Sequence, residues 1–199
     1  MNGALLGELR VERDDVKDLG RIVEALACAV EIKDSHTGQH LYRSALLASA
    51  CLEQIDYELS LCDDVGHGFL LHDVGKIGVP DSILTKPGEL TEIEWGLMKE
   101  HPRMGVQIVE PIGFSQNTLD VISYHHERWD GTGYPEGLEG TDIPLAARVF
   151  AVADTYDALT TDRPYRAALT KDSAIRYIST EAGARFDARV VAAFIALVA

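Results

Sequence analysis

Residues 72–80 read HDVGKIGVP, and the stretch begins with the adjacent pair His72 and Asp73. The apolar periodicity before the pair predicts a helix over 61–75, followed by a Gly/Pro-rich connection from Gly75 to Gly88. Neighbouring side chains on a helix point about 100° apart, so this pair can reach two metal ions on different sides. Burying both groups without a compensating charge would be unfavourable. The stretch therefore predicts a helical fold around a metal site.

The same helical periodicity extends to both sides of the pair, with no run of alternating strand pattern. Three local signals agree: a capping box at Thr91 to Glu94, a plausible N-cap at Asp187, and Pro144 at the start of a helical segment. A second Gly/Pro-rich connection runs from Asp130 to Pro144. The sequence therefore predicts an all-α fold with helices at 5–32, 38–55, 61–75, 92–101, 103–110, 116–127, 144–160, 171–182 and 187–198.

The first predicted helix allows two interpretations. Its apolar residues recur in steps of three and four, at Val16, Leu19, Val23, Leu26 and Val30. Such a seam is typical of an amphipathic helix packed on its own domain, or of a coiled-coil stalk that dimerises and carries a signal. The stalk interpretation divides the chain into residues 1–30 and a main domain over 31–199. It also predicts a homodimer through this helix and a sensor or receiver domain before residue 1.

Composition limits the class of protein. The 199 residues fit one main core, with 46% hydrophobic and 25% charged residues. A formal charge of −14 argues against binding to DNA or RNA polymers or to acidic membranes. There is no apolar run of transmembrane length and no basic leader, which predicts a cytoplasmic protein. The three cysteines form no C-x-x-C pair, so we expect reduced structural thiols.

Histidines cluster at predicted helix ends or beside acidic residues. A lone histidine is more often a hydrogen-bonded core residue than a ligand, but the adjacent pairs His72-Asp73 and His125-His126 favour metal binding. Imidazole and carboxylate ligands without thiolate favour non-haem iron or manganese. Two metals ~3.5–4 Å apart are a common device for phosphodiester hydrolysis. Five of the seven histidines belong to this set: His40, His72, His101, His125 and His126.

Several blocks of this sequence resemble the HD-GYP family. The stretch from His72 to Asp81, followed by Lys86-Pro87-Gly88, resembles the extended HD signature, and His125-His126-Glu127 to Gly133-Tyr134-Pro135 resembles the GYP signature. Further matching blocks are Thr37 to His40, His101-Pro102, Asp154 to Thr160 and Arg163 to Arg166. The blocks follow the family order over about residues 31–194. The resemblance implies an HD-type helical bundle and a metal-dependent phosphodiesterase.

The resemblance also implies a metal centre of two or three divalent ions. Iron is the expected metal, with manganese or nickel as alternatives, and Asp73 is expected to bridge. A subset of the family has a glutamate four residues before the first histidine as a ligand for a third metal, and here that position is His36. His36 is thus an alternative further ligand, with a loop position or a substrate contact as its other interpretations. The implied ligands are His40, His72, Asp73, His101, His125, His126 and Asp154.

Other residues receive roles from the same resemblance. Lys76 is expected to steady phosphoryl oxygens while water activated at the metal centre attacks phosphorus, and its plain alternative is a surface lysine. Arg163 and Arg166 resemble a pair that grips substrate phosphate; otherwise they would pair with Asp157 or Asp162. In the loop of Gly133, Tyr134 and Pro135, the tyrosine is a candidate for base recognition, with packing as the ordinary alternative. Asp157 is expected to orient a ligand or Lys76.

The implied reaction is hydrolysis of cyclic di-GMP to the linear dinucleotide pGpG, to GMP, or to both, in bacterial second-messenger signalling. One alternative keeps the hydrolysis but takes another cyclic dinucleotide, such as cyclic GMP-AMP. Another is a non-catalytic module, in which a metal-bound site serves signalling through protein contacts.

Overall fold

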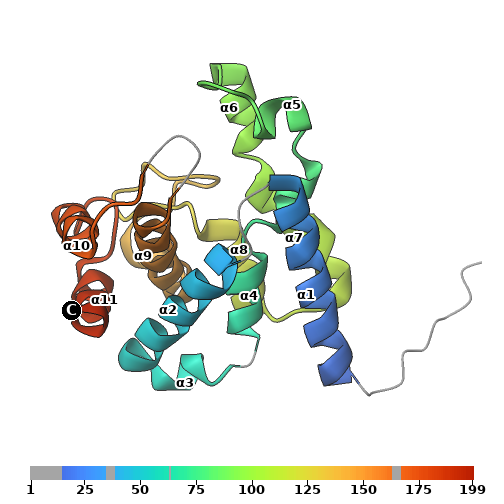
Figure 1. Ribbon diagram of the computed structural model, residues 1–199. Coiled ribbons are helices and arrows are strands. Elements are labelled where there is room, and N and C mark those ends of the chain that lie inside the picture. Colours follow the sequence, from blue (N-terminus) through green and yellow to red (C-terminus); the bar gives the residue numbers. More distant parts are fainter. Residues whose placement is uncertain (1–14, 35–38, 63, 163–166) are drawn as a thin grey trace, which may run out of the picture.

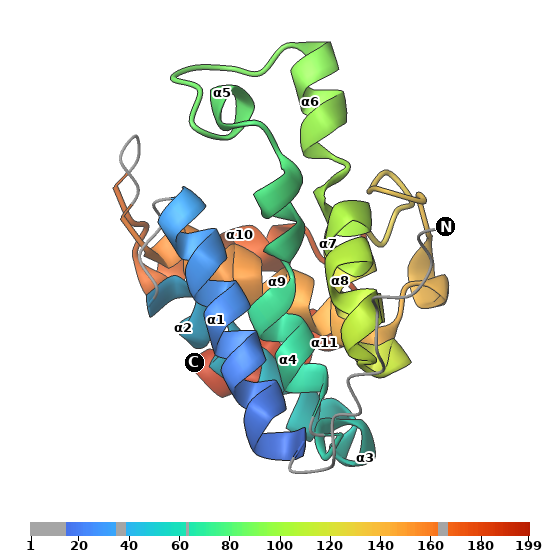
Figure 2. The same ribbon diagram turned by 90° about the vertical axis from the view of Figure 1, so that its right-hand side faces the viewer.

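The computed structural model describes residues 15–34, 39–62, 64–162 and 167–199, and these residues form a bundle of helices (Figures 1 and 2). Within these ranges there is no β-strand, and β-bridges occur only as isolated pairs. The all-α fold class predicted from the sequence is confirmed. In chain order the elements are α1 (Asp15–Asp34), α2 (Gln39–Ile55), α3 (Tyr57–Ser60), α4 (Val65–Leu71), η1 (Val74–Gly78), α5 (Asp81–Leu84), α6 (Glu92–Met98), α7 (His101–Val109), η2 (Glu110–Ile112), α8 (Gln116–Tyr124), η3 (Gly140–Asp142), α9 (Leu145–Thr160), α10 (Lys171–Thr180) and α11 (Ala188–Val198).

The larger hydrophobic core lies among α2, α4, α9, α10 and α11. Phe69 of α4 stacks on Phe150 of α9, with 5.3 Å between the ring centroids, and both side chains are fully buried. Cys51 of α2 and Phe194 of α11 are also inaccessible to solvent. This core holds α9 against α2 and places Phe150, in the middle of α9, beside His72 and His125.

A smaller core joins α1, α4, η1, α7 and α8. Val23 of α1 is buried in it, and Leu19, Leu26 and Val30 pack against the same cluster. The apolar seam of the first helix is thus turned towards the helix's own domain, as the first of the two interpretations predicts. A homodimer through this helix and a preceding sensor domain stay predictions.

Two predicted helices around the histidine pairs end earlier than predicted: the helix predicted over 116–127 ends at Tyr124, and the one predicted over 61–75 differs more. The segment predicted as a helix over 61–75 ends at Leu71, with His72 at its C-cap, and a 3₁₀ turn follows from Val74. The reason is a close approach between elements, because a Cβ atom on Gly75 would lie 1.8 Å from the carbonyl oxygen of His101. The chain leaves the helical path so that η1 can pack directly on α7.

The local signals at other helix ends are confirmed. Thr91 and Glu94 form the capping box of α6, and the Asp187 carboxylate accepts a hydrogen bond from the Arg189 backbone N–H at the start of α11. Pro144 directly precedes α9. The Gly75–Gly88 connection is more ordered than predicted, because it contains η1 and α5. Both views show α5 and α6 projecting from one end of the bundle (Figures 1 and 2).

None of the helices among the described residues combines the length and apolar character needed to cross a membrane.

Candidate metal centre

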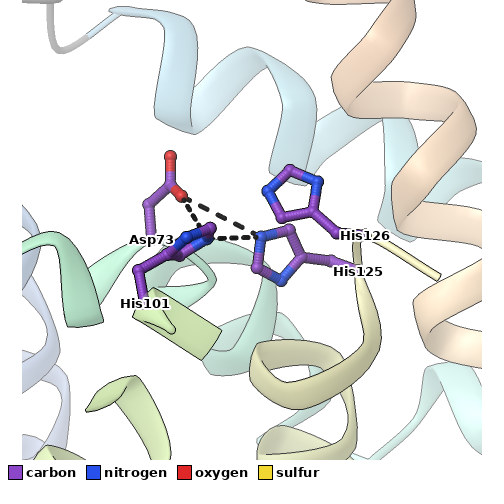
Figure 3. Close-up of side chains that lie close together, drawn as sticks. All are labelled: Asp73, His101, His125 and His126. Atoms are coloured by element: carbon purple, nitrogen blue, oxygen red, sulfur yellow. Dashed lines mark hydrogen bonds and ion pairs between the residues drawn. The ribbon is translucent and has the colours of Figure 1, made fainter. Parts of the chain in front are cut away.

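Four of the predicted ligands converge on one point. Each of them offers a ligand atom, and these atoms all lie within 4.8 Å of one another (Figure 3). His101 Nε2 lies 3.3 Å from Asp73 Oδ1 and 3.4 Å from His125 Nε2. Three histidines and one carboxylate at this spacing form a donor set suited to a borderline divalent ion. The four residues are Asp73, His101, His125 and His126.

The ends of helices bring these side chains together. His72 and Asp73 stand between α4 and η1, His101 is the first residue of α7, and His125 and His126 directly follow α8. The sequence had placed both adjacent pairs inside predicted helices. In the structure they lie just beyond helix ends instead. His72 Nε2 still lies 3.2 Å from Asp73 Oδ2, so the two neighbours face the same centre.

The ring orientations suit metal binding. The Nδ1 atoms of three buried histidines each lie within hydrogen-bonding distance of a backbone carbonyl: His72 with Phe69 at 2.9 Å, His101 with Met98 at 2.8 Å, and His125 with Ile122 at 3.0 Å. A carbonyl only accepts, so Nδ1 must carry the proton and Nε2 keeps its lone pair. Metal-binding histidines are commonly oriented in this way. The side chains thus fit a divalent metal without rearrangement of their hydrogen bonds.

A second group of ligands comes from α2 and α9. His40 Nε2 lies 3.5 Å from Asp154 Oδ1, while His40 Nδ1 bonds to the buried carboxylate of Asp157. Arg43 holds that carboxylate from the other side, with 2.6 Å between Arg43 Nε and Asp157 Oδ1. The structure places Asp157 in contact with the predicted ligand His40 rather than with Lys76. Arg43 was missed, although its position three residues after His40 on a helix was a signal.

Burial and neighbouring charges set the protonation states. Burial lowers the pKa of His125, and the nearby rings of His126 and His72 lower it further. The pKa of His126 is also well below its usual value, because of burial and then His101. Burial alone would raise the pKa of Asp73, but Lys76 and His72 hold it well below its usual range. Neutral His125 and His126 beside an ionised Asp73 are the forms that bind metals. Burial opposes the charged form of His72, but the carboxylates of Asp73 and Asp154 outweigh it and raise the pKa of His72.

Lys76 faces the centre. Its Nζ atom lies 2.8 Å from Asp73 Oδ2, and its side chain is 19% exposed. This contact places the cation beside the carboxylate that is expected to bridge metal ions. Lys76 is therefore not a solvated surface lysine, which was the alternative interpretation.

A pocket of about 390 Å³ opens over the centre. Lys76 lines it, and so do Trp95 and Met98 from the α6 region and Tyr134 from the GYP loop. Six of the seven predicted ligands also line this pocket: His40, His72, Asp73, His101, His126 and Asp154.

The loop of Gly133, Tyr134 and Pro135 lies against this pocket. The Tyr134 ring stacks on His126, with 4.7 Å between centroids, and burial raises its pKa. Gly133 fits so closely that a Cβ atom there would lie 2.4 Å from the Arg128 backbone nitrogen. The position of Tyr134 is compatible both with packing against a ligand and with a contact to substrate. Three other predicted site residues, His36, Arg163 and Arg166, lie outside the described residues.

Comparison with known proteins places the chain in a family. The family model described as "HD domain" matches residues 24–190. The chain is 43% identical over 175 residues to the cyclic di-GMP phosphodiesterase response regulator RpfG of Xanthomonas campestris, an alignment covering 85% of this chain and 46% of that protein. It is 37% identical over 172 residues to 3'3'-cGAMP-specific phosphodiesterase 2 of Vibrio cholerae, covering 85% of this chain and 33% of that protein.

A solved structure shares the fold. The cyclic GMP-AMP specific phosphodiesterase V-cGAP3 of V. cholerae superposes with a TM-score of 0.70 at 19% sequence identity, covering 90% of this chain and 48% of that one. The chain spans less than half the length of these relatives. The HD and GYP signatures lie within the matched region, and the chain belongs to the HD domain family, as its resemblance to the HD-GYP proteins predicted.

Proposed function

We propose that this domain hydrolyses a phosphodiester bond of a cyclic dinucleotide, and that its substrate is cyclic di-GMP. The observation that carries the proposal is that six of the seven predicted ligands line one pocket, with His125 in contact with His101 and Lys76 beside Asp73. A module that only bound a partner would have no need for a lysine aimed at the bridging carboxylate. The product would be pGpG, GMP or both.

The donor set would hold divalent metal ions, with iron preferred and manganese or nickel as alternatives, in a centre of two or three ions. The residues that would hold them are His40, His72, Asp73, His101, His125, His126 and Asp154, with Asp73 as the expected bridging carboxylate. Bound there, the ions would polarise the phosphoryl group and lower the pKa of water. His36 is the candidate for a further ligand.

The protein side chains position the substrate. Lys76 would donate to the phosphoryl oxygens as negative charge develops on them. Arg163 and Arg166 would bind phosphate, because a planar guanidinium can contact two oxygens at once. Tyr134, held between His126 and the pocket, would offer its ring to a guanine base.

A second substrate has specific support. Some relatives are named cyclic di-GMP phosphodiesterases and others 3'3'-cGAMP-specific phosphodiesterases, at similar levels of identity. Both substrates present a cyclic phosphodiester with a guanine base, so the described centre could serve either. Cyclic GMP-AMP is therefore the alternative substrate.

The test is anaerobic turnover by protein loaded with ferrous iron or manganese, with metal per chain counted on the same sample. We expect hydrolysis of cyclic di-GMP with two or three metals bound, and slower hydrolysis of cyclic GMP-AMP. The His72→Ala variant should lose metal and turnover together, whereas His67→Ala, a histidine outside the centre, should keep both. A fully loaded protein that hydrolyses neither dinucleotide would refute the proposal.

A further inference from the structure

A second pocket adjoins the first beyond the metal ligands. Its volume is about 410 Å³, and it shares Trp95, His126, Tyr134 and Asp154 with the pocket that contains Lys76. Lys76 lines the first pocket and not the second. A ligand that extended past the shared residues would therefore leave Lys76 behind and meet a different set of side chains.

Three Lys and Arg side chains line this second pocket, and among the described residues only one of them forms an ion pair with a carboxylate. Arg128 is bound to Asp130, with 3.2 Å between Arg128 Nη2 and Asp130 Oδ2. Among the described residues no carboxylate lies within 4 Å of Lys99 or Arg185, which also line the pocket. In a chain with a formal charge of −14, two unpaired cations in one pocket form a local site for an anion.

Neutral contacts hold both cations in place. Lys99 Nζ lies 5.5 Å from the centroid of the Tyr134 ring and 5.8 Å from that of Trp95. The Arg185 guanidinium donates to the hydroxyl oxygens of Tyr177 at 3.2 Å and Thr155 at 3.4 Å. Aromatic faces and hydroxyl groups orient a cation without neutralising it, so the positive charge stays available to a ligand.

The carboxylates near these cations have other partners. Glu100 and Glu136 both bind Arg103. Glu127, which lines the same pocket, accepts two hydrogen bonds through Oε1 from the backbone N–H groups of Glu136 and Gly137. Glu100 and Glu136 are thus paired with Arg103, whereas the Glu127 carboxylate keeps its charge at the pocket wall, with Oε2 buried and without a hydrogen-bond partner among the described residues, and Asp154 contributes a further carboxylate.

We propose that Lys99 and Arg185 bind the second phosphodiester of a cyclic dinucleotide, the one that is not cleaved. This inference rests on the proposed function and deepens it. A cyclic dinucleotide carries two phosphodiesters, each with one negative charge. While one lies at the metal centre beside Lys76, the other needs a cationic partner on the far side of the shared residues. Lys99 and Arg185 would make this site selective for ligands with two phosphates over those with one.

The experiment compares two probes on metal-loaded protein. Binding of the cyclic bis-phosphorothioate analogue of cyclic di-GMP, which resists hydrolysis, is measured by calorimetry. Hydrolysis of bis(p-nitrophenyl) phosphate, which has one phosphodiester, reports on the metal centre and Lys76. The variants are Lys99→Gln, Arg185→Gln and both together. The matched control is Arg176→Gln with Arg189→Gln, because it also removes two positive charges and neither residue lines either pocket.

We expect each single variant to bind the analogue about tenfold more weakly, and the double variant about a hundredfold more weakly, since each loses a charge-assisted contact. The ratio of analogue affinity to bis(p-nitrophenyl) phosphate turnover should fall by a similar factor. The control should change neither measurement. Thermal unfolding checks that Arg185→Gln folds, and Lys99→Gln provides an independent test, because the Lys99 ammonium lies over ring faces and forms no ion pair among the described residues.

Equal losses with both probes would overturn the inference, because they would mean that these cations act on the metal centre or on the fold. Unchanged analogue affinity would overturn it as well. If the wild-type protein binds the analogue through these residues but does not hydrolyse cyclic di-GMP, the inference stands and the proposed function fails. If the wild-type protein does not bind the analogue, both fail.

Discussion

The carboxylate of Asp157 lies between a cation and a predicted metal ligand. Arg43 donates to both carboxylate oxygens, and one of them, Oδ2, also accepts the Nδ1 proton of His40. We predict that Asp157→Asn weakens metal binding by about 10- to 100-fold, because the loss of this charge leaves the His40 ring less basic and less well oriented. Metal per chain, measured by equilibrium dialysis over a series of free manganese concentrations, gives the affinity.

Asp172→Asn is the control for that measurement, since it removes a negative charge from an exposed position in the first turn of α10. If both variants bind manganese as tightly as the wild-type protein, Asp157 does not position a ligand.

Cys51 should be the least reactive of the three thiols. It is fully buried in the larger core, and burial raises its pKa to about 11, whereas Cys28 is exposed and Cys62 intermediate. The raised pKa favours the folded state while the thiol is protonated. That contribution is complete below the unfolded pKa near 9 and is lost as pH rises through about 11. Labelling of native protein with a thiol reagent at pH 8 should modify Cys28 first and Cys51 only on unfolding. Early labelling of Cys51 would contradict the described core.

The clustered histidines and Asp73 were predictable as candidate ligands from the sequence, while other members of the site were not. His72, Asp73, His125 and His126 belong to motifs whose donor chemistry is visible in the sequence. Lys99 and Arg185 resemble ordinary surface cations until the fold places them over Tyr134 and beside Thr155. Whether these two cations can bind an anion depends on which carboxylates lie near them, and tertiary structure decides that.

At the scale of the element, the turn after α4 depends on Gly75. A Cβ atom there would lie 1.8 Å from the His101 carbonyl oxygen and 2.4 Å from the Gly105 nitrogen, and both are backbone atoms that cannot move aside easily. We predict that Gly75→Ala lowers the free energy of unfolding by about 3 kcal/mol or more, measured by urea denaturation. It should also reduce metal binding, because η1 would separate from the start of α7.

The matched control is Gly96→Ala in α6, where a new Cβ atom would meet nothing within 4 Å. Alanine there should raise the free energy of unfolding by about 0.5–1 kcal/mol, because it favours the helix. Similar stability of the two variants would contradict the close packing of η1 on α7.

The same turn explains why element boundaries were harder to predict than elements. Apolar periodicity continues through residues 61–75, so the sequence predicted one helix. The helix breaks at His72 because the packing of η1 on α7 outweighs local helical preference. Caps depend on neighbours along the chain, and the Thr91–Glu94 box and the Asp187 cap were therefore predicted correctly.

At the scale of the molecule, the metal centre lies where the two hydrophobic cores meet. The His72 ring lies 4.6 Å from that of Phe150 in the larger core, while Val74, two residues further on, belongs to the smaller one. The helices α4 and α8 contribute residues to both cores. Ions bound there would tie together ligands from α2, α7 and α9 and from the ends of α4 and α8, and metal binding should therefore stabilise the whole domain.

We predict a large effect of metal removal on thermal stability. A ligand that binds only the folded state at 1,000 times its dissociation constant adds about 4 kcal/mol, and in a domain of this size that raises the unfolding midpoint by roughly 8–15 °C. Differential scanning calorimetry with saturating manganese and after chelation measures the difference. His101→Ala should abolish most of it, because this buried ring contacts both Asp73 and His125, whereas His67→Ala should retain it. An unfolding midpoint that chelation leaves unchanged would mean that the histidine cluster is a hydrogen-bonded core and not a metal centre.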